Sequence, residues 1–104
     1  MTIALASETN PIAVEIGQLI ETAHRSMTQC KADLLEQIRL FDLLELATEC
    51  GARTTAQFLM RRLGISASTA HEYVGVAHRL APYLRLQKHF AAGELSYSVV
   101  RLLL

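Results

Sequence analysis

The chain has 104 residues, enough for one domain with a modest core, and its two Pro, five Gly and 51% hydrophobic content favour long helices over short strands. The sequence contains no run of about 18 or more apolar residues, which is the length needed to span a membrane, so we expect no membrane span. No basic stretch precedes the first apolar run, so we expect no signal peptide. The formal net charge of zero divides into −5 for residues 1–50 and +5 for residues 51–104, which indicates either a half that faces nucleic acid or two halves that complement each other within one fold or across a dimer.

The first half of the chain predicts one long helical element after a short tail. Residues 1–9 have no periodicity, so we expect a flexible tail there. Asn10 followed by Pro11 is typical of a helix N-cap and its first turn, and Gly51 is a natural stop. These signals predict a long helix within residues 10–50.

Apolar residues recur along this helix at the 4-3 spacing of helices that pair with one another. The earlier half has a narrow seam, which predicts a partner helix and a homodimer; its residues are Ile16, Ile20, Ala23, Met27, Cys30 and Leu34. The later half is wider, because Leu35, Ile38 and Leu46 add a second apolar row, so we expect it to pack inside a bundle. A break into two helices at the more polar stretch His24–Lys31 is the alternative.

Residues 51–104 predict several short helices separated by caps. Thr54 with Gln57 opens a helix over 55–63, and Gly64 ends it. The turn continues with Ile65 as an apolar plug and with Ser66, which caps a helix over 67–80.

Two further helices follow the Ala81-Pro82 break. Pro82 is expected to open the first, which ends at Gly93, and Ser96 to cap the second. We expect Tyr83, Leu86 and Phe90 to face inward from the first helix, and Tyr97, Val100 and Leu103 to share one face of the second. The apolar pattern is unfinished at Leu104, so we expect the region to be truncated there. The fold class predicted is therefore all-α, with a long N-terminal helix, or two, and a helix-turn-helix-like bundle of short helices.

The segment Phe58–Arg79 carries the functional signal, because two helices joined by Gly-Ile-Ser form a helix-turn-helix pattern. In such motifs the second helix lies in the major groove of DNA, and its N-terminal residues meet the bases and phosphates. Arginines on the preceding helix suit backbone phosphates. The candidate DNA-binding residues are Arg61, Arg62, Ser66, Ser68, Thr69, His71, His78 and Arg79.

The opposing interpretation is a structural corner or a protein interface. The second helix lacks the Arg, Lys, Asn or Gln side chains that read bases with two hydrogen bonds. Glu72, expected on its outer face, would repel phosphate, and Gly75 would weaken the helix. Oligomerisation or protein interaction without DNA contact therefore stays open beside DNA binding.

A resemblance enters at the same segment. The stretch GARTTAQFLMRRLGISASTAHEYVGVAHRL, followed by FAAGELSYSVVRLL, resembles the actinobacterial domain of unknown function also called the thirteen-E-twelve repeat family. Its most specific features are the turn at Arg61–Ala70 and the corner at Ala91–Ser96. In many members of that family a similar helical region precedes an HNH endonuclease domain. Together with the helix-turn-helix spacing and the +5 charge of residues 51–104, the resemblance leads to the hypothesis of a non-catalytic module that binds or positions double-stranded DNA, with the nuclease domain absent from this chain.

Other chemistry finds little support in the residues. Cys30 and Cys50 stand alone, so we expect reduced thiols, packed as small hydrophobes, in a cytoplasmic protein. His71 and His78 are seven residues apart, too far for a shared metal on one helix. No nucleophile motif, glycine-rich phosphate loop or His-Asn-His constellation occurs. We expect no enzyme activity, no cofactor, no metal and no small-molecule substrate.

Overall fold

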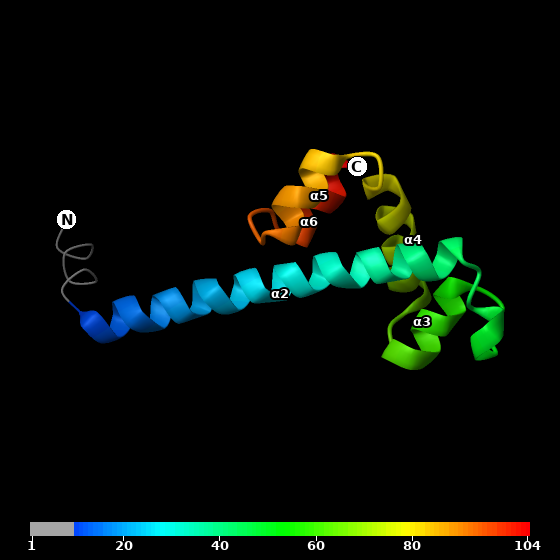
Figure 1. The fold of residues 1–104 in the computed structure, drawn as a ribbon. Helices are drawn as coiled ribbons and strands as arrows, with labels where there is room; N and C mark the ends of the chain where they lie inside the picture. The colour runs from blue at the N-terminus through cyan, green and yellow to red at the C-terminus, as the bar shows by residue number, and fades with distance from the viewer. Residues whose placement is uncertain (1–9) are drawn as a thin grey trace.

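The computed structural model describes residues 10–104 as a set of helices arranged around one long helix (Figure 1). The helices are α2 (Pro11–Leu43), α3 (Thr55–Leu63), α4 (Ala67–Leu80), α5 (Leu84–Ala91) and α6 (Tyr97–Leu103), with a short 3₁₀ turn, η1 (Thr48–Cys50). Residues 10–104 contain no strand, which confirms the all-α class and its division into one long and several short helices. The tail predicted for residues 1–9 lies outside the described residues.

Helix α2 is a single helix, so the alternative of a break at His24–Lys31 is wrong. Its N-terminus is the predicted one: the Asn10 side chain accepts hydrogen bonds from the amides of Ile12 (3.0 Å) and Ala13 (3.1 Å), and Pro11 occupies the first turn. At 33 residues the helix is about 50 Å long. It therefore sets the 59 Å longest dimension of the molecule.

The long helix ends at Leu43, before the stop predicted at Gly51. Glu45 adopts the left-handed region (φ 52°). Its amide donates to the carbonyl of Asp42, and the amide of Leu46 donates to that of Phe41, both at 3.1 Å. This is the Schellman termination, here built without glycine. Gly51 (φ 75°) ends the following η1 turn instead.

The core forms where the second half of α2 meets the short helices. Leu35 and Ile38 of α2 are buried, as the wider apolar row predicts. They pack against α3 and α4, whose bounds match the predicted ranges 55–63 and 67–80, and against α5 and α6. The buried cluster consists of Leu35, Ile38, Ala56, Leu59, Ala70, Val76, Ala77, Leu80, Phe90 and Val100.

The last two helices depart from the prediction in two places. Helix α5 begins at Leu84, because the amide of Tyr83 donates to the carbonyl of Leu80 (3.0 Å) and places Pro82 in a turn. Tyr83 is exposed, whereas it was expected to face inward. Ser96 caps α6 as predicted, accepting from the amide of Val99 at 3.3 Å.

The turn between α5 and α6 rests on the middle of α2. A Cβ atom added at Gly93 would lie 2.4 Å from Cγ and 3.0 Å from the carbonyl oxygen of Arg25. The Gln29 amide donates to the carbonyl of Ala92 (3.1 Å). Residues 11–24 extend beyond this contact as an arm, which projects past the short helices in Figure 1. Below, "the arm" means residues 11–24.

Candidate nucleic-acid interface

The corner between α3 and α4 forms as its capping residues predict. The Thr54 hydroxyl accepts from the amide of Gln57 (3.0 Å), although the Gln57 side chain returns to the amide of Arg53 and not to that of Thr54. Gly64 ends α3 in the left-handed region (φ 66°), and Ile65 packs against the core. The turn therefore holds α4 at a fixed angle to α3.

Three hydroxyl groups gather at the N-terminus of α4. The Ser66 hydroxyl accepts from the amide of Thr69 (3.2 Å) and lies 3.2 Å from the Ser68 hydroxyl and 3.0 Å from that of Thr69. Ser66 and Ser68 are exposed, and Thr69 is half-buried. The amides and the dipole of a helix N-terminus favour an anion, so this end of α4 can receive a phosphate group.

Two exposed arginines lie at the end of α3, immediately before the turn. The Arg61 guanidinium donates to the carbonyl of Gly51 (3.1 Å), and that of Arg62 lies 4.9 Å from the centre of the Phe58 ring. Within residues 10–104 neither forms an ion pair with a carboxylate. Both positive charges also complement the dipole at the C-terminus of α3, which is a structural role in its own right.

The solvent-facing row of α4 continues from Ser68 through His71 to Arg79, all three exposed. Gly75 lies in this row, and a Cβ atom there would stand 2.9 Å from Nη1 of Arg79. The missing side chain thus gives the guanidinium room to lie along the helix. From the sequence we inferred only that Gly75 weakens the helix. The signal that Gly75 makes room for Arg79 was the spacing of four residues between them, which places both on one face of a helix.

His78 points away from this row. Its Nε2 lies 2.5 Å from Oδ2 of Asp42 on α2, and Oδ1 of Asp42 accepts from the buried Thr55 hydroxyl at 2.6 Å. The hydrogen bond from Thr55 and the contact with His78 hold the pKa of the Asp42 carboxyl below its ordinary value. His78, predicted as a candidate DNA-binding residue, therefore ties α4 to α2 and does not lie in the solvent-facing row.

The Glu72 carboxylate is also paired with other side chains. It accepts from the Tyr97 hydroxyl (2.8 Å) and from Nη1 of Arg101 (3.1 Å), both on α6. The bond from Tyr97, followed by that from Arg101, lowers the pKa of Glu72, while burial raises that of Tyr97. The Lys31 ammonium donates to Tyr73 beside this cluster (2.5 Å). The phosphate repulsion expected from Glu72 is therefore offset by neighbouring positive charge.

The predicted seam of α2 lies largely on the molecular surface. Five of its six residues are exposed, and Leu34 alone is half-buried against the core. Ile16, Ile20 and Met27 are 52%, 65% and 69% exposed. Cys30 is exposed on the same row, and Cys50 is exposed as well, so the expectation that both thiols are packed is wrong.

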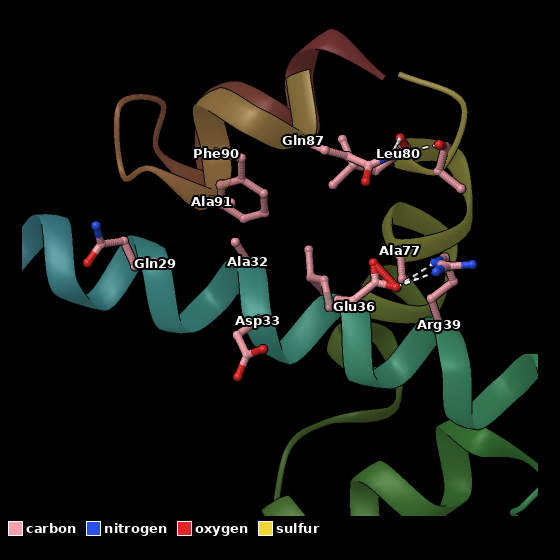
Figure 2. Close-up of a pocket in the computed structure, with 12 residues that line it drawn as sticks. Gln29, Ala32, Asp33, Glu36, Arg39, Ala77, Leu80, Gln87, Phe90 and Ala91 are labelled. Atoms are coloured by element: carbon pink, nitrogen blue, oxygen red, sulfur yellow. Dashed lines mark hydrogen bonds and ion pairs between the residues drawn. The ribbon is translucent and has the colours of Figure 1, made fainter. Parts of the chain in front are cut away.

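A cavity of about 380 Å³ lies between α2, α4 and α5 (Figure 2). Most of its polar side chains are paired: Glu36 with Arg39, and the Gln87 amide with the carbonyls of Leu80 (3.0 Å) and Ala81 (2.6 Å), whereas Asp33 forms no hydrogen bond or ion pair within residues 10–104. Phe90 forms part of its apolar wall. The cavity is thus lined by a turn that the Gln87 side chain holds in place and by an ion pair, and not by a set of free catalytic groups.

Within residues 10–104 no three His, Cys, Asp or Glu side chains gather in a geometry that would hold a metal ion. None of the helices in this part of the chain combines the length and the hydropathy needed to cross a membrane.

Residues 16–104 match the family model described as Domain of unknown function (DUF222), which covers α2 from its second turn and all the short helices. No curated protein and no solved structure matches the chain. Because the family model spans most of its length, the chain belongs to the DUF222 family.

Proposed function

We propose that this chain is a non-catalytic module that binds or positions double-stranded DNA. The observation that carries the proposal is the α3–α4 corner: three hydroxyls at the N-terminus of α4 follow two exposed arginines that lack carboxylate partners within residues 10–104. Phosphate contacts of this kind fix a helix-turn-helix on DNA, while base contacts add sequence specificity. Because α4 lacks side chains that can read a base with two hydrogen bonds, we expect affinity for DNA with little sequence preference.

The proposed contact residues are those of the predicted set that face solvent or line the helix N-terminus. His78 is omitted, because its imidazole is bound to Asp42. The remaining residues are Arg61, Arg62, Ser66, Ser68, Thr69, His71 and Arg79. By the resemblance of Arg61–Ala70 and Ala91–Ser96 to the thirteen-E-twelve repeat family, we further propose that the module serves an actinobacterial HNH endonuclease in the cytoplasm.

The test is the salt dependence of duplex binding, measured by fluorescence anisotropy. Each phosphate contact contributes about 0.9 to the slope of log K against log salt concentration. The double variant Arg61→Ala/Arg62→Ala should bind more weakly and with a shallower slope. Arg85→Ala/Lys88→Ala, which removes the same charge from exposed positions on α5, is the matched control. Absence of binding at about 50 mM salt, or equal slopes for the two variants, would contradict the proposal.

A second candidate function is self-association, and the exposed apolar row of α2 favours it. Ile12, Ile20 and Met27 are each about two-thirds exposed on one side of a helix that no other described element covers there. Monomeric proteins rarely leave so long an apolar row in water. Ile20→Asp should raise the dissociation constant of a homodimer at least tenfold, roughly the effect of one buried aliphatic side chain. Gln18→Asp on the polar side is the control, and a parent chain that sediments as a monomer contradicts the candidate.

A further inference from the structure

The exposed apolar row of the arm leads into a groove between α2 and α3. The groove has a volume of about 150 Å³, and its apolar lining includes Leu34, Ile38 and Phe41 from α2 and Phe58, Leu59 and Leu63 from α3. Leu34 belongs to both the groove and the predicted seam. One continuous apolar surface therefore runs from Ile12 on the arm to Phe41 near the end of α2.

The two parts of this surface lie in opposite halves of α2: the arm is residues 11–24, and the α2 side of the groove runs from Leu34 to Phe41. Helix α2 contains 33 residues, so each half is about 25 Å long. A two-fold axis near the middle of α2 would lay the arm of one copy along the groove half of the other, and the same contact would repeat on the opposite side. Such a self-complementary, closed arrangement is the usual geometry of a homodimer.

Charge distinguishes this antiparallel arrangement from a parallel one. The arm carries Glu15 and Glu21 and contains no Lys or Arg, whereas α3 carries Arg61 and Arg62 and contains no acidic residue. Antiparallel packing brings the acidic arm toward the basic α3 of the partner. Parallel packing sets two acidic arms side by side and leaves both grooves uncovered. Ser66, Ser68 and Thr69 do not line the groove, so an arm seated there leaves the N-terminus of α4 open.

The surface also supplies a substantial part of the area that a stable dimer buries. From Ile12 to Leu34 the row extends about 33 Å along a helix whose diameter is about 10 Å. Length times width gives a surface area of several hundred Å² before the uneven shape of the side chains is counted. The groove adds to this, and a stable dimer needs about 800 Å² from each copy. We propose that two copies of the chain associate antiparallel, with the arm of each in the α2–α3 groove of the other. This inference rests on the proposed self-association and specifies its geometry.

Crosslinking of introduced cysteines with a bis-maleimide tests the antiparallel geometry directly. In a background of Cys30→Ser and Cys50→Ser, one chain carries Ile16→Cys and another carries Gln37→Cys; both positions are exposed. Each variant is treated with a short bis-maleimide, alone and after the two are mixed and allowed to exchange. The antiparallel dimer places residue 16 of one copy near residue 37 of the other, so only the mixture should give crosslinked dimer. Gln18→Cys in place of Ile16→Cys is the matched control, because it lies on the polar side of the arm, and its mixture should not crosslink.

The other outcomes separate the two levels of the inference. If each variant crosslinks alone, the helices are parallel, and the antiparallel geometry is wrong while self-association stands. If the cysteine-free chain sediments as a dimer but no sample crosslinks, the dimer uses another surface, and the geometry is again wrong. A monomer at micromolar concentrations in sedimentation overturns both the geometry and the self-association on which it rests.

Discussion

The contact between the α5–α6 turn and α2 can be tested with one glycine substitution. Gly93 has φ 79°, so Gly93→Ala forces a side chain into the left-handed region at a cost of roughly 1–2 kcal/mol. The new Cβ would also lie 2.4 Å from the Arg25 side chain and 3.0 Å from its backbone carbonyl. The side chain can move aside, but the carbonyl moves only with α2, so we add about 1–3 kcal/mol for overpacking.

Gly51 and Gly64 supply the matched controls. Both have positive φ, and a Cβ atom at either would meet nothing within 4 Å. Gly51→Ala and Gly64→Ala should therefore show the conformational cost alone. Urea unfolding, monitored by circular dichroism at one fixed protein concentration, gives all three free energies of unfolding. If Gly93→Ala destabilises no more than the two controls, the turn does not rest on α2 as described, and the reasoning is refuted.

Further predictions concern the end of α2 and the ionised pairs. Glu45→Gly should raise the free energy of unfolding by about 1 kcal/mol, because it relieves a left-handed non-glycine residue (φ 52°); a lower urea midpoint would contradict this. The pKa values of Asp42 and Glu72 are lowered in the folded state, so the stability that they contribute is present above their ordinary values of 3.8 and 4.5 and is lost as the pH falls through the folded values. Asp42→Asn should therefore flatten the acid limb of a urea-midpoint profile, and an unchanged limb would count against the Asp42 network. Tyr97→Phe removes the donor to Glu72, so the Glu72 pKa, followed by NMR, should rise toward its ordinary value; no change would show that the bond does not form in solution.

Local signals in the sequence account for most of the helix boundaries. Asn10, Thr54, Ser66 and Ser96 each cap a helix in the predicted place, because a short polar side chain next to an apolar periodic segment satisfies free amides regardless of the rest of the fold. The end of α2 escaped prediction for a related reason. Its left-handed residue is Glu45, whose side chain gives no sign of that conformation, whereas Gly51 gives a strong sign a few residues too late.

The candidate site was predictable only where it depends on one helix. The spacing of Ser66, Ser68 and Thr69 places their hydroxyls at the start of α4 from helix geometry alone. The partners of Glu72 and His78 lie on α6 and α2, so no local pattern indicates that these two side chains are paired. Helical periodicity shows which residues share a face, but tertiary packing decides which face meets solvent.

The most direct test of the proposed DNA contact is NMR of the 11.5 kDa chain during titration with a duplex at low salt. We predict that amide signals of Ser66, Ser68 and Thr69 and side-chain signals of Arg61 and Arg62 shift first, and that added salt reverses the shifts. If no signal moves, or if the shifts are confined to the arm of α2 and to α5, the α3–α4 corner does not bind DNA.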